Sequence, residues 1–324
     1  MQEVREKLRV LMNRLKNIQD VFSDLFGVED IYSNSKTFEI LIADTLGQDL
    51  IPGHSGSRDA KNSFEEEFEY KHYKETSCNH TWTFNDFSDV TIQRLHGVKA
   101  VIFAHINDTG SYPIFDWYYE VPGKVIADYL ENKTRFIQNV RKMINVSPRQ
   151  IEREIKINKN ICAIQTNGTY TKFLKEIFEI VHEIEKTVET KGILTSNKFW
   201  EILIGAKLGH QVLSKQTEYD AIDQNNNYYE YKVSKTPSFN FEDISENVLN
   251  KFANIRKVIL AVVNKEKLEI AVMYEAEPLR VVERLKEKLE EKVERFTAMG
   301  KEIRRLQVSL SKGDLERIGA VRII

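Results

Sequence analysis

The hydrophobic pattern along the chain predicts helices alternating with strands. Apolar residues recur at helical spacing from Val4 to Phe26 and from Phe173 to Ile184, as in helices with one buried face. A shorter helix is expected at Phe38–Leu46 and a long amphipathic one at Arg280–Arg295. Short apolar runs typical of strands occupy 68–73, 100–106, 117–120, 257–263 and 268–274. This alternation predicts an α/β fold with a central mixed sheet flanked by helices.

The sequence also repeats itself. The segments 38–43, 59–60 and 69–71 recur as 200–205, 220–221 and 230–232, and the segments 98–104, 119–120 and 145–147 are matched by 255–261, 274–275 and 307–309. The order is kept throughout, and only short gaps are needed. The duplication predicts two similar tandem domains, 1–160 and 161–324, packed as a pseudo-symmetric pair and linked near residues 158–168.

Composition narrows the class of protein without deciding it. The 324 residues are 41% hydrophobic and carry a net charge of -2, which argues against a broadly basic nucleic-acid coat protein but allows a local basic groove. Cys78 and Cys162 have neither metal-ligand spacing nor a disulfide framework, so a cytoplasmic location is expected. No stretch of the sequence is apolar enough for a membrane span, and no phosphate-binding loop for a nucleotide is present.

The repeated residues point to metal chemistry. In each half an aspartate precedes a Glu-Tyr-Lys motif by ten positions, Asp59 before Glu69-Tyr70-Lys71 and Asp220 before Glu230-Tyr231-Lys232. On a strand the glutamate and the lysine share one face. Two converging carboxylates repel each other unless a cation holds them, and oxygen ligands with open water positions suit Mg²⁺. The backbone carbonyls of Tyr70 and Tyr231 would supply a third ligand.

Two further groups complete this expected chemistry. Lys71 and Lys232 would lie beside the metal, where an ammonium can orient or help deprotonate a water and counter charge developing on a phosphate. Glu39 and Glu201, on the preceding helix of each half, are expected to reach the same site or a second metal.

One such spacing would arise easily by chance in a chain with 30% charged residues. Two copies in register are harder to dismiss, because residues 61–67 and 223–229 between the motif positions have drifted almost completely. The duplication therefore favours a catalytic role in at least one half.

These motifs resemble the PD-(D/E)XK nuclease superfamily, in particular type II restriction endonucleases. The resemblance covers 37–104 and 199–261 and implies a restriction-endonuclease-like fold in each half. It implies that Asp59, Glu69, Asp220 and Glu230 are metal ligands, that Lys71 and Lys232 are catalytic, and that Glu39 and Glu201 are auxiliary acids. Arg58 and Tyr219 stand where the family name has proline, a position that the family keeps loosely.

The resulting expectation is a monomeric, Mg²⁺-dependent, sequence-specific endonuclease that cuts each strand of double-stranded DNA with one of its two sites. Arg58, Lys74 and Lys235 are candidates for contacts with the DNA backbone. Three alternatives stay open. One half serves only for DNA recognition, the protein is a repair or junction nuclease, or it binds DNA without cutting it.

Overall fold

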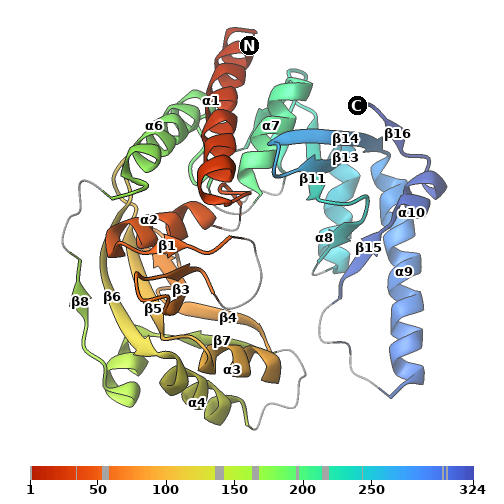
Figure 1. Ribbon diagram of the computed structural model, residues 1–324. Coiled ribbons are helices and arrows are strands. Elements are labelled where there is room, and N and C mark those ends of the chain that lie inside the picture. The colour runs from red at the N-terminus through yellow and green to blue at the C-terminus, as the bar shows by residue number, and fades with distance from the viewer. Residues whose placement is uncertain are drawn as a thin grey trace. The chain divides into compact units, whose positions relative to one another are not determined.

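The computed structural model describes residues 2–33, 35–52, 58–135, 142–162, 168–194, 197–213, 219–242, 244–300, 303 and 306–324, without the side chains of 2, 85–87 and 142. Contacts divide the chain into two compact units, residues 17–182 and residues 1–16 with 183–324. Each unit contains a six-stranded mixed sheet flanked by helices (Figure 1). The predicted α/β class, with one central mixed sheet in each half, is confirmed.

The division between the units differs from the boundary expected at residues 160–161. Helix α1 (Gln2–Phe26) and helix α6 (Thr171–Val188) each contribute residues to both units. Lys7 of α1 and Glu183 of α6 both belong to the unit formed by residues 1–16 and 183–324. The Lys7 ammonium lies 3.1 Å from the Glu183 carboxylate. Because the first residues of the chain contact this unit, we call the two bodies the N-terminal unit (17–182) and the C-terminal unit (1–16 and 183–324).

The sheet of the N-terminal unit has the strand order β1-β2-β3-β5-β6-β8. Among its described residues, β3 and β5 are the one parallel pair of neighbours. β5 is buried almost throughout, which explains its continuous apolar sequence. The strands are β1 (Asp49–Leu50), β2 (Ala60–Lys61), β3 (Glu67–Lys74), β5 (Ala100–Asn107), β6 (Ile114–Pro122) and β8 (Asn160–Ile161).

The sheet of the C-terminal unit repeats this plan, with the order β9-β10-β11-β13-β14-β16 and a parallel pair at β11 and β13. Lys71 pairs with Phe103 and Lys232 pairs with Leu260. The structure thus confirms that segment 98–104 corresponds to 255–261. The strands are β9 (Gln211–Val212), β10 (Ala221–Ile222), β11 (Tyr228–Ser234), β13 (Ile255–Asn264), β14 (Glu269–Ala276) and β16 (Val321–Arg322).

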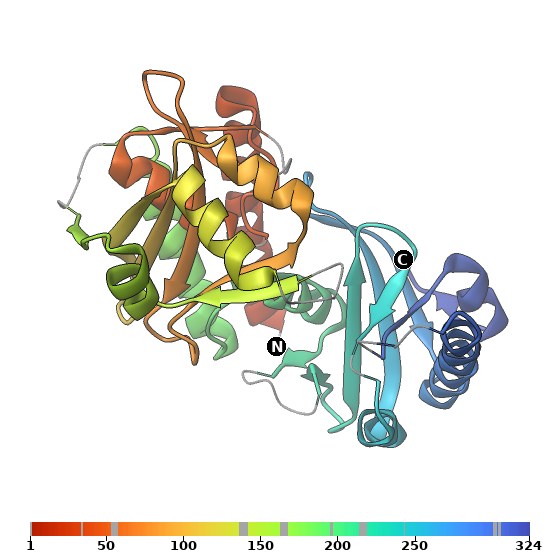
Figure 2. The ribbon, with the colours of Figure 1, turned by 90° about the horizontal axis from the view of Figure 1, so that it is seen from below.

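Helices cover the sheets in both units. Figure 2 shows α3 (orange) and α4 (yellow) side by side in the N-terminal unit. In the described residues, no helix has the length and apolar character that crossing a membrane requires. Besides α1 and α6 the helices are α2 (Lys36–Leu46), α3 (Asp89–His96), α4 (Gly123–Thr134), α5 (Pro148–Gln150), the π-helix η1 (Ile151–Ile155), α7 (Lys198–Leu208), α8 (Glu246–Lys251), the 3₁₀-helix η2 (Phe252–Asn254), α9 (Pro278–Ala298) and α10 (Lys312–Arg317).

Each unit also has a two-stranded antiparallel ribbon, β4 (Trp82–Phe87) with β7 (Lys142–Val146) and β12 (Phe239–Phe241) with β15 (Val308–Leu310). Phe84 faces Ile144 in the first ribbon, and Phe241 faces Val308 in the second. One face of each ribbon belongs to the hydrophobic core of its unit. The ribbons are therefore a second duplicated feature.

The ribbons correct one part of the sequence alignment. Segment 145–147 was matched with 307–309, but strand pairing makes residues 144–147 equivalent to 308–311. Ser147 and Ser311 follow the ribbons directly, and each begins a helix with a capping box. The match made from the sequence was wrong by two residues because it aligned one valine with another valine. Such an identity is a poor guide, since the inward face of a strand accepts any apolar side chain.

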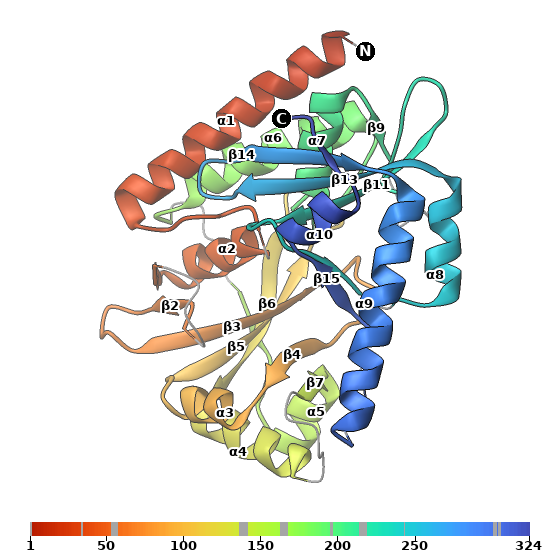
Figure 3. The ribbon, with the colours of Figure 1, turned by 90° about the vertical axis from the view of Figure 1, so that its right-hand side faces the viewer.

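Asp314 connects α10, in which it lies, to α9 and is only 5% exposed. Its carboxylate accepts hydrogen bonds from Arg284 Nε (2.7 Å) and Lys288 Nζ (2.6 Å) of α9 and from the backbone N–H of Ser311 (2.8 Å). Figure 3 shows α9 beside β15 and α10. Burial raises the pKa of Asp314, but the bonds from Lys288, Ser311 and Arg284 outweigh burial and hold the pKa well below its ordinary value.

We predict that Asp314→Asn destabilises the protein at pH 7 by about 1–3 kcal/mol, since it removes the charge that two cations and a helix cap share. A carboxyl with a lowered folded-state pKa stabilises above its unfolded pKa of about 3.9 and loses this contribution as the pH falls through the folded value. The difference between wild type and variant in urea denaturation should therefore narrow below about pH 4. A difference independent of pH would contradict this role.

Candidate active sites

The aspartate of the N-terminal unit is fixed by the backbone of the neighbouring strand. Asp59 lies just before β2, and its N–H donates to the Phe68 carbonyl at 2.8 Å. Its Oδ2 accepts a hydrogen bond from the backbone N–H of Tyr70 at 2.7 Å. The carboxylate is thereby held beside the residue that separates Glu69 from Lys71, so the structure brings the predicted aspartate to the predicted motif.

Glu69 and Lys71 form an ion pair on the same face of β3. Glu69 is 7% exposed, and its Oε1 accepts from the Lys71 ammonium. Its other oxygen, Oε2, is buried and has no hydrogen-bond partner among the described residues. A buried carboxylate oxygen without a partner is costly and calls for an explanation such as a bound ion.

A second lysine enters the site from α2. The ammonium of Lys36 lies 2.7 Å from Glu39 Oε2, and the Lys36 side chain is only 6% exposed. Glu39 itself stands in the first turn of α2. Sequence reasoning missed Lys36, although the signal was present: a lysine stands three residues before the helical glutamate in both halves of the chain.

Electrostatic crowding shifts the pKa values of the two glutamates and the two lysines of this site. Burial, with the Asp59 charge acting in the same direction, raises the pKa of both Glu39 and Glu69 to about 7 against the opposing effect of the lysines. Burial lowers the pKa of Lys36 and Lys71, but the surrounding carboxylates outweigh burial and raise it above the ordinary value. Both lysines are therefore cations in the protein without metal.

The C-terminal unit contains the same arrangement. Asp220 donates its N–H to the Tyr229 carbonyl at 3.1 Å and accepts from the Tyr231 N–H at 2.7 Å. Lys232 forms an ion pair with Glu230 on the same face of β11. Burial raises the pKa of Glu230, with Asp220 acting in the same direction and Lys232 opposing.

Helix α7 contributes the other two members of the C-terminal site. Lys198 forms an ion pair with Glu201, and its ammonium also lies 3.4 Å from the Leu213 carbonyl. Burial raises the pKa of Glu201, and the Asp220 charge adds to this rise. Each unit thus assembles three carboxylates and two lysines. We call Lys36, Glu39, Asp59, Glu69 and Lys71 the N-terminal site, and Lys198, Glu201, Asp220, Glu230 and Lys232 the C-terminal site.

The central tyrosine of each motif anchors its strand on the opposite face. The Tyr70 hydroxyl donates to Gln48 Oε1, and the Tyr231 hydroxyl lies 2.8 Å from His210 Nδ1. Gln48 and His210 occupy equivalent positions after α2 and α7. The sequence repeat therefore showed that the two positions correspond, but it did not show that they bind the tyrosines. The predicted metal contact of each tyrosine involves its backbone carbonyl and stays a prediction.

The catalytic-lysine candidates also contact the ribbons. The Lys71 ammonium lies 5.5 Å from the centre of the Phe84 ring, and the Lys232 ammonium lies 5.5 Å from the centre of the Phe241 ring. An aromatic face attracts a cation at this distance. The ribbon of each unit therefore helps to position its lysine.

The three residues predicted to contact DNA lie outside these clusters. Arg58 forms a 2.9 Å ion pair with Glu67, and Lys74 lies 3.5 Å from Asp108. Lys235 is exposed just after β11. The loops before the two aspartates, 53–57 and 214–218, lie outside the described residues, and so do the polar side chains His54, Ser55, Ser57, Gln216, Thr217 and Glu218.

The donor set of each site fits a hard divalent cation. Three carboxylates gather in a poorly hydrated place, two of them with raised pKa values, and Glu69 Oε2 lacks a partner. Asp59 and Glu69 would hold such an ion in the N-terminal site, and Asp220 and Glu230 in the C-terminal site.

A separate acidic group lies on the surface of the N-terminal unit. Within the described ranges, His96, Asp128 and Glu131 form the one group of three histidine, cysteine or acidic side chains whose ligand atoms all lie within 4.8 Å of one another. All three are exposed. The three carboxylates of each candidate site do not all meet this distance criterion. Each of them is bonded to a lysine or a backbone N–H, so a cation that binds there must displace the lysine ammonium groups.

A comparison of the sequence with models of known protein families finds no match, and a comparison with curated proteins finds no match either.

We predict that the metal-free protein loses stability as the pH rises. Glu39 and Glu69 have folded-state pKa values of about 7, above their ordinary value of 4.5. A group with a raised pKa stabilises fully below its unfolded value and loses this contribution as the pH passes through the folded value. The melting temperature in EDTA should fall between about pH 5 and pH 8, and Mg²⁺ should restore it at the upper end. The fall in melting temperature should be smaller in Glu69→Gln than in the wild type. An equal fall in the two proteins over this pH range would contradict the prediction.

A second prediction concerns Lys36, whose ammonium stands where a divalent cation would compensate Glu39. Lys36→Met should raise the affinity of the N-terminal site for Mn²⁺ about tenfold, equivalent to about 1.4 kcal/mol. Isothermal titration calorimetry measures this affinity, and Lys198→Met should act likewise on the C-terminal site. Lys61→Met is the matched control, because Lys61 pairs with Glu65 on the surface. Equal affinities for Lys36→Met and this control would refute the role.

Proposed function

We propose that the chain is a Mg²⁺-dependent endonuclease that hydrolyses phosphodiester bonds of double-stranded DNA. One observation carries the proposal: an aspartate, a glutamate and a lysine have the same backbone and side-chain hydrogen bonds in both units. A structural ion pair would not need a carboxylate fixed by the neighbouring N–H, nor a buried glutamate oxygen without a partner. The arrangement in Asp59, Glu69 and Lys71 supports hydrolysis at a metal centre.

The residues divide the chemistry between them. When bound, Mg²⁺ supplies a Lewis acid and lowers the pKa of a bound water. The Lys71 and Lys232 ammonium groups carry a positive charge at the place where negative charge develops on the scissile phosphate. With a pKa of about 7, Glu39 can accept or release a proton at its carboxylate near neutral pH.

The finer fold assignment rests on the resemblance of the motifs. We propose that each unit is a restriction-endonuclease-like domain, in which a helix bearing a glutamate precedes the strands that carry Asp and Glu-x-Lys. The shared strand order of the two sheets supports a common origin for both units. A type II restriction enzyme working in the cytoplasm fits a nuclease with these motifs.

The duplication suggests how both strands would be cut. DNA strands are antiparallel, so cutting both normally requires two active sites, which most enzymes obtain from a homodimer. Here one chain carries two complete sites. A monomer can therefore make a double-strand break, and its two halves are free to recognise different bases.

A second candidate keeps the activity in one unit only. The N-terminal site is the more deeply buried, with Glu69 and Glu230 side chains 9% and 19% exposed. Among the described residues, Glu69 supplies the one site oxygen that is buried without a partner. If only one site cuts, these differences favour the N-terminal one.

The test uses supercoiled plasmid DNA with Mg²⁺. Lys71→Ala and Lys232→Ala should each nick one strand and make linear product at least about 100-fold more slowly than wild type, the usual size of such catalytic contributions. The double variant should do neither. Lys99→Ala is the control, because Lys99 pairs with Glu66 on the surface.

The products distinguish the two candidates. If Lys232→Ala linearises DNA at the wild-type rate while Lys71→Ala is inactive, a single site cuts and the two-site proposal is wrong. If wild type leaves DNA intact with Mg²⁺ present, the nuclease proposal itself fails.

A further inference from the structure

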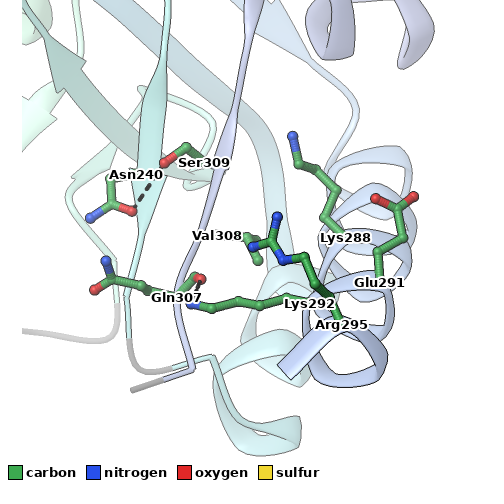
Figure 4. A pocket seen from close by; sticks show the side chains of 8 residues that line it. All are labelled: Asn240, Lys288, Glu291, Lys292, Arg295, Gln307, Val308 and Ser309. Atoms are coloured by element: carbon green, nitrogen blue, oxygen red, sulfur yellow. Dashed lines mark hydrogen bonds between the residues drawn. The ribbon is translucent and has the colours of Figure 1, made fainter. Parts of the chain in front are cut away.

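The C-terminal unit has a pocket of about 320 Å³ between α9 and its ribbon. Figure 4 shows its walls: Lys288, Lys292 and Arg295 come from α9, whereas Asn240 and Ser309 come from β12 and β15. No residue of the C-terminal site lines it. The pocket is therefore separate from the metal-binding cluster.

Positive charge dominates the lining. Three cationic side chains face one acidic residue, Glu291, whose carboxylate points away from β15 in Figure 4. Glu291 also lies 3.7 Å from Arg284. Of the three cations, Lys288 shares the Asp314 carboxylate. The other two, Lys292 and Arg295, lie toward the C-terminal end of the helix.

The walls are held in place by hydrogen bonds across the pocket. Lys292 Nζ donates to the Gln307 carbonyl at 2.6 Å, which connects α9 to the residue just before β15. On the ribbon, Ser309 Oγ donates to Asn240 Oδ1 at 3.3 Å. The pocket therefore combines fixed cations with amide and hydroxyl groups, the side chains that proteins most often direct at phosphate oxygens of nucleic acids.

An aromatic ring lies next to the cations. The Lys292 ammonium is 6.0 Å and the Arg295 guanidinium 5.7 Å from the centre of the Phe296 ring. Cations beside an aromatic ring are the combination with which proteins hold the phosphates and bases of nucleic acid strands.

The duplicated plan of the fold does not require these cations. Helices α4 and α9 follow equivalent strands, but α4 has 12 residues whereas α9 has 21. Lys292, Arg295 and Phe296 lie in the additional length. The N-terminal unit builds its sheet and ribbon with the shorter helix, so the additional length of α9 is a feature in which the two units differ.

The pocket lies on the far side of the strand that positions the catalytic-lysine candidate. Neighbouring strand residues point to opposite faces, so Asn240 lines the pocket while Phe241 faces the core. The Phe241 ring is the one that the Lys232 ammonium contacts at 5.5 Å. The ribbon therefore adjoins both the pocket, through Asn240, and the C-terminal site, through Phe241.

We propose that the pocket binds a backbone phosphate of DNA and anchors the nucleic acid to the C-terminal unit. This inference rests on the proposed function and adds to it an asymmetry between the units, since the anchor lies on the helix that is longer in the C-terminal unit. Arg295 and Lys292 would contact the phosphate oxygens, and Asn240 and Ser309 would contact the adjoining sugar-phosphate.

The test measures binding of a fluorescent DNA duplex in EDTA over a series of salt concentrations. Arg295→Ala should weaken binding about tenfold at low salt and reduce the slope of log K against log salt by about 0.9, the change for one phosphate contact. Lys292→Gln, which keeps a hydrogen-bond donor for the Gln307 carbonyl, should act likewise. Lys286→Ala is the matched control, because Lys286 is an exposed cation on the same helix outside the pocket.

Two outcomes of the salt series would overturn the proposal. One is a wild-type salt slope in Arg295→Ala and Lys292→Gln, with folding verified by thermal melting. The other is an equal loss of affinity in Lys286→Ala, which would attribute the effect to net charge. A pocket for free phosphate rather than DNA would instead show inorganic phosphate binding that Arg295→Ala abolishes while duplex affinity is unchanged, and that result also counts against an anchor.

The experiment separates this inference from the proposed function. If wild type cleaves plasmid DNA with Mg²⁺ but the pocket variants bind duplex normally, the anchor is wrong and the nuclease stands. If wild type never cleaves but Arg295→Ala loses duplex affinity and salt slope, the anchor stands and the nuclease is wrong.

Discussion

The hydrogen bond from the Tyr70 N–H to Asp59, with its copy from Tyr231 to Asp220, ties the chemistry of each site to the pairing of its strands. The main chain holds the aspartate beside the glutamate, so mutual repulsion cannot separate the two carboxylates. Buried carboxylates that cannot separate must take up protons, pair with cations or bind a metal. The raised pKa of Glu69 and its ion pair with Lys71 are the first two of these responses, and the proposed Mg²⁺ is the third.

Backbone pairing also explains why so much of each site was predictable. Asp, Glu and Lys sit at fixed offsets along paired strands, and a register shift of one residue would turn the side chains to the other face. The motif was therefore visible twice in the sequence, as were β5 and β13, whose buried apolar runs leave a clear pattern. The residues between the motif positions drifted because the hairpin turn tolerates change.

Other parts carried too little pattern to be read. Strands β1, β8 and β16 have two residues each, too few for any periodicity. The ribbon strands β12 and β15 have three, and there the alignment slipped by two residues. Lys36 and Lys198 were missed for a different reason: a lysine three residues before a glutamate is common on exposed helix surfaces. Only the fold shows that these pairs are turned inward, toward the aspartates.

The two copies differ chiefly around their sites. Each unit retains three carboxylates and two lysines in the same contacts, whereas the helix after β6, α4, has 12 residues and the helix after β14, α9, has 21. An enzyme that needs identical chemistry on two strands must keep both catalytic sets, but nothing forces the surfaces that grip each strand to stay alike. Under the proposed function, divergence limited to the surroundings is therefore the expected result of duplication. A single chain can then bind an asymmetric DNA sequence, which a homodimer with two identical surfaces reads less well.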